Sequence, residues 1–263
     1  MKYKILLIIL CLFFTGCQKT DVINDYKEKE ESIPQITQTP REVISEYEVP
    51  ILMYHYIRDY NDPNDEIGTN LSVSPNNFEK QIVWLKDNNY ETVNFDYFFE
   101  PHKLENNKKP IIITFDDGYK DAFENAFPIL KKYDFKGIFY IVSKFMDKDN
   151  YLSWEDAKKM SKENMVIAAH TVSHLNLAEL NQEKLTQEII NNKIDIKNNI
   201  GSETVDFCYP AGKYNEKVIA TLKEQNFKTA TTVKNGIASQ NSDLFELPRI
   251  RITNNTNLEK ILQ

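Results

Sequence analysis

Short apolar runs alternate with longer segments of helical periodicity through most of the chain. The apolar runs predict buried strands, and the segments between them, with apolar residues three or four apart, predict amphipathic helices. Strands are expected at residues 51–57, 90–95, 111–115, 137–142, 165–169, 205–209, 227–233 and 247–252, and helices at 74–89, 121–133, 153–163, 181–199 and 215–226. This alternation over about 200 residues predicts an α/β fold of parallel strands, either a barrel or a doubly wound sheet.

Residues whose side chains could act in catalysis or metal binding lie at the ends of the expected strands. Because the carboxyl ends of parallel strands meet on one face, active sites of such folds gather there, and we expect a single shared site. These residues are His55, Asp116, Asp117, His170, Tyr209 and Pro210.

Two of these strand ends carry the residue types of a metal centre. His170 and His174 are four residues apart, a spacing that places two imidazoles on one side of a helical turn. Two histidines and a carboxylate are a common zinc ligand set that leaves a position open for water. The alternative is two unrelated polar residues in a loop.

Adjacent carboxylates at Asp116 and Asp117 repel each other unless a cation lies beside them. One carboxylate can hold a divalent metal, and the other can take a proton from water whose pKa the metal has lowered. The alternative is a hairpin turn at Asp117-Gly118. The helical spacing of residues 119–130 argues against that turn.

The N-terminus predicts export. A basic start and an apolar run of roughly ten residues are too short to span a bilayer of about 30 Å but fit a signal sequence. The small residues before Cys17 resemble a bacterial lipoprotein signal; the alternative is an ordinary secretory signal. We therefore expect a signal peptide at 1–17 with lipidation of Cys17, a flexible tether at 18–49 and one domain at 50–263. The protein would be lipid-anchored at the extracellular face of the cytoplasmic membrane.

Charge and cysteine content limit the function classes. The net charge is −7 and no basic stripe is present, so nucleic acid is a poor partner, whereas a neutral or weakly cationic substrate is acceptable. The three cysteines have no regular spacing and predict no disulfide framework. Cys208 lies in an apolar run and is expected to be a small buried side chain.

Three sequence motifs together resemble a known family. TFDDG at 114–118, HTVSH at 170–174 and FCYPAGKYN at 207–215 are similar, in this order, to the first three motifs of the polysaccharide deacetylase family, carbohydrate esterase family 4. Residues 51–57, residues 71–93 and LPRI at 247–250 further resemble the biofilm poly-β-1,6-N-acetylglucosamine N-deacetylases. The resemblance covers about residues 50–255.

The resemblance implies a fold, a metal and a reaction. The fold is an incomplete (β/α) barrel of about seven strands, and the reaction is hydrolysis of N-acetyl groups on an extracellular N-acetylglucosamine polysaccharide. By the family pattern Asp116 is the base, and Asp117, His170 and His174 hold a divalent metal, most simply Zn²⁺. The backbone N–H of Tyr209, next to Pro210, would hold the oxyanion. Tyr119, Trp154 and Tyr209 are candidates for stacking on sugars, with core packing as the alternative.

The chain departs from the family pattern in two places. Many members carry a late histidine as the general acid, but no histidine follows His174. Of the remaining two, His102 lies in a polar segment, so we assign the acid role to His55; the alternative is a core histidine bonded to the backbone. The third motif also lacks the arginine that orients the base. Arg249 or Arg251 could supply it, and the resemblance favours Arg249 over a surface role.

Other functions remain open from the sequence. The same metal site would serve a peptidoglycan or chitin-oligomer N-deacetylase, or an O-acetyl xylan esterase. A catalytically inert glycan-binding lipoprotein is a different class. The presence of both carboxylates and of His55, His170 and His174 argues against it.

Overall fold

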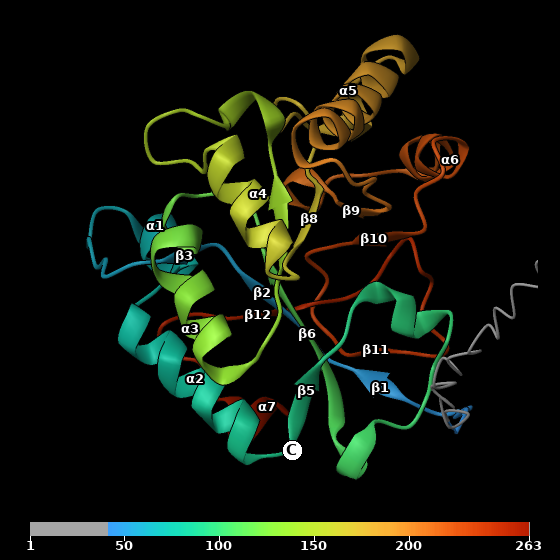
Figure 1. Ribbon diagram of the computed structural model, residues 1–263. Helices are drawn as coiled ribbons and strands as arrows, with labels where there is room; N and C mark the ends of the chain where they lie inside the picture. The colour runs from blue at the N-terminus through green and yellow to red at the C-terminus, as the bar shows by residue number, and fades with distance from the viewer. Residues whose placement is uncertain (1–41, 263) are drawn as a thin grey trace, which may run out of the picture. The chain divides into compact units, whose positions relative to one another are not determined.

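The computed structural model describes residues 42–262, which are built around an eight-stranded sheet whose strand pairings are all parallel (Figure 1). The strand order is β10-β9-β8-β7-β6-β2-β12, and β5 pairs with the first half of β6. The strands are β2 (Ile51–Tyr54), β5 (Tyr90–Thr92), β6 (Lys109–Phe115), β7 (Ile138–Ile141), β8 (Val166–Ala169), β9 (Asp206–Cys208), β10 (Thr229–Thr231) and β12 (Ile250–Arg251). The sheet curls into a half-barrel, which confirms the predicted incomplete (β/α) barrel.

The segment before β12 links the two edges of this sheet. Leu247 forms a parallel bridge with Thr231 of β10, and Ile250 pairs with Leu52 of β2. Residues 247–251 therefore run from the side of β10 to the side of β2. Arg249 lies in the middle of this link, and its side chain is fully buried.

The helices that follow the strands lie around the outside of the sheet (Figure 1). Two of them begin at the residues that the sequence suggests: Ser74 caps one by accepting from the Asn77 N–H, and Ser153 forms a capping box with Asp156 in another. The helices are α2 (Pro75–Asp87), α3 (Phe127–Tyr133), α4 (Trp154–Lys162), α5 (Gln182–Ile200) and α6 (Glu216–Glu224).

Alternate residues of β6 enter different environments, as the two-residue period of a strand requires. Ile111, Ile113 and Phe115 belong to the larger apolar core, whereas Ile112 belongs to a second cluster. Thr114 receives a hydrogen bond from Arg249. The strand is buried on both faces, so it holds the two residues that follow its carboxyl end, Asp116 and Asp117, in fixed positions.

The helix expected at residues 121–133 changes type just before Pro128. A π-helical turn (Ala122–Ala126) passes into α3 at Phe127, and Pro128 lies in the first turn of α3. Ala126 and Phe127 both have helical φ and ψ, so the helix continues through this change of type.

The predicted end of the tether is wrong. Residues 42–49 pack on the domain: β1 (Glu48–Val49) pairs antiparallel with β11 (Ala238–Ser239), and Val43 bridges His102. The packing of these residues cannot be predicted from the sequence, because a two-residue strand has no detectable period. The predicted signal peptide and Cys17 lie outside the described residues. Within residues 42–262, no helix has the length and apolar character needed to cross a bilayer.

Several short elements were also not predicted. They lie in polar stretches or are too short to show a period. These are β4 (Ser72–Val73) and the helices α1 (Glu66–Leu71) and α7 (Leu258–Leu262). β4 pairs with β3 (Tyr56–Ile57), which lies within the strand expected at 51–57; the structure interrupts that strand at His55.

A half-buried carboxyl at the amino end of β9 gives a testable pH dependence of stability. Burial raises the pKa of Asp206 from 3.8 to about 6, although the Thr229 hydroxyl donates to it at 2.7 Å. The folded protein binds this proton more tightly than the unfolded chain does, so the cost of ionising Asp206 is absent below about pH 4 and complete above about pH 6. We expect Asp206→Asn to raise the free energy of unfolding by about 1–2 kcal/mol at neutral pH and hardly at all near pH 4. Urea unfolding at both pH values measures this; an equal effect at both would contradict it.

Candidate active site

A buried ion pair holds the first carboxylate after β6. Arg249 donates from Nη1 to Asp116 Oδ1 and from Nη2 to Asp116 Oδ2, both at 2.7 Å. Its Nε donates to the Thr232 carbonyl, which fixes the plane of the guanidinium. Burial raises the pKa of the Asp116 carboxyl, but the Arg249 guanidinium outweighs burial and lowers it to about 2. Asp116 is therefore an oriented carboxylate that stays ionised.

The second carboxylate faces two imidazoles. Asp117 Oδ1 lies 3.3 Å from His170 Nε2 and 3.3 Å from His174 Nε2. Burial raises the pKa of the Asp117 carboxyl, but the two imidazoles hold it well below its usual range. The structure thus brings together the three residues that the sequence analysis assigned to a metal, although they come from the ends of two different strands.

The spacing of these atoms fits a small divalent ion. One ligand atom from each of the three residues lies within 4.8 Å of the others. Ligands placed tetrahedrally at 2.0–2.1 Å from zinc are themselves about 3.3 Å apart, which matches the two Asp117 contacts. His170 Nδ1 is occupied by the Cys208 carbonyl at 2.7 Å, so its Nε2 is the nitrogen that faces Asp117. The donor set and its orientation therefore suit Zn²⁺.

The backbone around these residues adopts conformations that side chains normally avoid. Asp117 has a φ of 74°, His174 a φ of 57°, and the β-branched Thr171 a φ of 69°. Such strain persists where the surrounding structure imposes it, and it is concentrated at functional sites. In this chain, the strained positions include two of the three candidate ligands.

His55 lies beside the base. Its Nε2 is 3.8 Å from Asp116 Oδ2, and its side chain is 13% exposed. Burial lowers the pKa of the His55 imidazole, while the charges of Asp116 and Asp117 oppose this change. The imidazole is thus at the edge of the site with access to solvent. Arg251, the alternative to Arg249, is exposed.

The expected role of Tyr209 needs correction. Its backbone N–H donates to the Thr231 carbonyl at 3.2 Å, so the sheet already uses the N–H that was assigned to the oxyanion. Its ring is buried and its hydroxyl donates to the Phe245 carbonyl, so Tyr209 is a core residue and does not stack on sugars. Pro210, also buried, has no N–H. The next N–H along the chain is that of Ala211, and no hydrogen bond joins it to another residue within 42–262.

The other two aromatic candidates have different surroundings. Tyr119 is half-buried and stacks on Tyr56 with ring centroids 3.7 Å apart. Trp154 begins α4 and packs against the larger apolar core. Tyr119 lies two residues from Asp117, so it borders the site, whereas the contacts of Trp154 are those of a core residue.

Two buried polar residues of α5 bind the backbone of the loop at residues 170–174, which carries both candidate histidine ligands. The sequence did not predict this role for them. Asn192 Oδ1 accepts from the His170 N–H and its Nδ2 donates to the Ile141 carbonyl, both at 3.1 Å. One helical turn earlier, Glu188 Oε2 accepts from the Ser173 N–H at 2.8 Å. The only signal in the sequence was a pair of polar residues four apart on the apolar face of a long helix.

We expect Asn192→Leu to weaken metal binding by about 10–100-fold, because loss of a group that orients a ligand has this effect. Competition with a chelator measures the affinity directly. The matched control is Asn198→Leu, because Asn198 is exposed on the same helix. Equal affinities of the Asn192 variant and wild type would show that Asn192 only supports the fold.

Comparisons with known proteins find relatives over most of the chain. Residues 103–230 match the polysaccharide deacetylase family. The chain is 32% identical over 213 residues to YxkH of Bacillus subtilis, covering 78% of this chain and 71% of YxkH. It is 26% identical over 225 residues to the poly-β-1,6-N-acetyl-D-glucosamine N-deacetylase of Staphylococcus aureus, covering 77% of this chain and 78% of that protein.

A solved structure extends the similarity to the fold. The deacetylase PplD of Streptococcus pyogenes, solved in complex with acetate, superimposes with a TM-score of 0.75 at 31% identity. The match covers 83% of this chain and 98% of PplD. The half-barrel, the shared motifs and these matches show that the chain belongs to the polysaccharide deacetylase family of hydrolases.

Proposed function

We propose that this protein removes N-acetyl groups from an extracellular β-linked N-acetylglucosamine polymer, with poly-β-1,6-N-acetylglucosamine as the preferred substrate and Zn²⁺ as the metal. The observation that carries the proposal is the convergence of His170 and His174 on Asp117, directly beside the Asp116–Arg249 pair. The similarity to the S. aureus enzyme supports the β-1,6 linkage.

Different residues of the site bind the metal and accept the proton during amide hydrolysis. A divalent cation held by Asp117, His170 and His174 would lower the pKa of water and polarise the acetyl carbonyl. Asp116 accepts the proton of the attacking water. A carboxylate with a pKa of about 2 is a weak base. It can deprotonate only water whose own pKa has been lowered. The base, Asp116, therefore has to lie next to a group that would hold the metal, and Asp117 is the adjacent residue.

The remaining groups act on the acetamide itself. His55, when protonated, delivers a proton to the leaving nitrogen, because its imidazole borders Asp116 and remains accessible. The Ala211 N–H takes the oxyanion role that was expected of Tyr209, because it is the next N–H along the chain after that of Tyr209 and is not used by the sheet. The products are acetate and a glucosamine unit.

We expect His55→Ala to lower kcat by about 10²–10⁴-fold while metal binding is retained, since the leaving amine loses its proton donor. Steady-state acetate release together with metal analysis of the purified variant measures both quantities. Near-normal turnover with the metal retained would remove the assignment.

The substrate proposal is tested by measuring acetate release from β-1,6-linked and β-1,4-linked N-acetylglucosamine oligomers of equal length. We expect a higher kcat/KM for the β-1,6 series. A preference for β-1,4 oligomers would favour a chitin or peptidoglycan substrate, and release only from acetylated xylan would favour an esterase.

We further propose that Cys17 carries the lipid that holds the protein at the outer face of the cytoplasmic membrane. The apolar leader and the small residues before Cys17 support this. Labelling cells with a fatty acid should mark the protein, and Cys17→Ala should abolish the label. Labelling that persists in the variant would contradict it.

A further inference from the structure

A row of stacked side chains borders the candidate metal site. Tyr119, two residues after Asp117, stacks on Tyr56 at 3.7 Å. The Arg58 guanidinium lies over the Tyr56 ring at 3.6 Å and over the Tyr60 ring at 4.3 Å. Arg58 Nε also donates to the Ser72 hydroxyl, so the guanidinium is fixed between the two rings. The row connects the site to the loop after β3.

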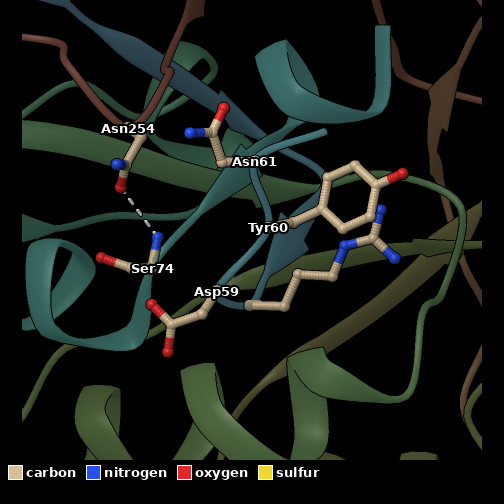
Figure 2. A pocket seen from close by; sticks show the side chains of 6 residues that line it. Asp59, Tyr60, Asn61, Ser74 and Asn254 are labelled. Carbon is tan, nitrogen blue, oxygen red and sulfur yellow. Dashed lines mark hydrogen bonds between the residues drawn. The ribbon is translucent and has the colours of Figure 1, made fainter. Parts of the chain in front are cut away.

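A polar cavity of about 380 Å³ lies at the Tyr60 end of this row (Figure 2). Figure 2 shows Asn61 and Asn254 on one side of it, with Asp59 and Ser74 opposite and Tyr60 at one end. The lining residues are Arg58, Asp59, Tyr60, Asn61, Ser74 and Asn254.

The row continues past Tyr119 in the opposite direction. The Tyr119 and Tyr151 rings stack at 5.2 Å, and Tyr151 lines a second cavity of about 800 Å³ with Lys148 and Asp149. The ring beside Asp117 therefore stands between two polar cavities, one at each end of a single row. Within the row, neighbouring side chains cover the faces of the rings. A ligand can therefore contact only the ring edges and the polar groups of the row.

The lining of the Tyr60 cavity suits a sugar better than an anion or an apolar ligand. Its amide and hydroxyl groups both donate and accept hydrogen bonds, as sugar hydroxyls and acetamides do, and its carboxylate accepts them. Asp59 and Asn61 are exposed, and no hydrogen bond joins either side chain to another residue of the described chain. Arg58 and Asp59 give this lining one charge of each sign and therefore no net attraction for a phosphate or carboxylate ligand, and an apolar ligand would leave the polar groups unpaired.

We propose that the Tyr60 cavity binds a sugar unit of the polymer that is not the unit being deacetylated, so that the enzyme acts on internal units of a chain lying along the row. This inference rests on the proposed function and adds a requirement for chain length. Asp59 and Asn61 hydrogen-bond the distant sugar, and the Tyr60 ring forms the end wall of its site.

The experiment compares kcat/KM for a β-1,6-linked N-acetylglucosamine dimer and pentamer. For the wild-type protein we expect the pentamer to be better by about tenfold or more, the effect of one or two additional hydrogen bonds. In the double variant Asp59→Ala/Asn61→Ala, the ratio of pentamer to dimer should fall toward one, through KM rather than kcat.

Paired variants separate a binding role from a structural one. Tyr60→Ala should lower the ratio, whereas Tyr60→Phe, which loses only the hydroxyl bonded to Asp65, should keep most of it. The exposed Asn198 on α5 supplies the control Asn198→Ala, which should keep the wild-type ratio. A wild-type ratio near one, or variants that slow both substrates equally, would overturn the inference while leaving the deacetylase intact. Acetate release from neither substrate by the wild-type protein would overturn the proposed function and this inference together.

Discussion

Replacing Asp117 with alanine is expected to lower kcat/KM by about 10³-fold or more, because a metal that polarises the carbonyl and activates water supplies several kcal/mol of transition-state stabilisation. Asp117 is the only carboxylate that both His170 and His174 approach within residues 42–262. Its loss leaves two imidazoles, which hold zinc far more weakly than three ligands do.

Metal content distinguishes this effect from misfolding. The Asp117→Ala protein should retain its circular dichroism spectrum and lose bound zinc after dialysis, whereas the wild-type protein keeps it. Asp87→Ala is the matched control, since Asp87 is exposed at the end of α2. Retention of both zinc and turnover by Asp117→Ala would contradict the assignment.

Arg249→Met is expected to lower the free energy of unfolding by about 3–5 kcal/mol, the usual cost of removing one partner of a buried ion pair. Arg249 is fully buried, and its side chain also donates to Thr114 and Thr232. Asp116 would be left buried without a counter-charge, so its pKa should rise and its fixed orientation should be lost. We therefore expect turnover to fall together with stability.

A second variant isolates the charge. Asp116→Asn combined with Arg249→Met leaves no unpaired buried charge at this pair, so the double variant should be more stable than Arg249→Met alone, although it remains inactive. Urea unfolding of the single and double variants measures the coupling. A loss below about 1 kcal/mol in Arg249→Met would show that the pair contributes little to stability.

The strand ends of the fold were predictable because buried strands leave a simple pattern. Residues 111–115 are apolar except for Thr114, so the sequence marks where β6 ends and where Asp116 and Asp117 begin. Parallel strands then bring these carboxylates and the end of β8 to one face, which allowed His170 to be placed beside them. The arrangement of the strands into an incomplete barrel was indicated by the motifs at 114–118, 170–174 and 207–215.

The parts that were missed depend on contacts between distant segments. Asn192 is a polar residue in a helix, and only the packing of α5 on β8 shows that it holds the His170 backbone. The Tyr209 N–H was misassigned because strand pairing with Thr231 leaves no trace in the local sequence. Residues 42–49 read as tether because their pairing partners lie far along the chain.

Anomalous X-ray diffraction from crystals of the zinc-loaded protein tests whether Asp117, His170 and His174 hold one metal ion. We expect one strong peak about 2.0–2.2 Å from a carboxylate oxygen of Asp117 and from the Nε2 atoms of His170 and His174. A protein that is active and saturated with zinc but has no peak between these three side chains would contradict it.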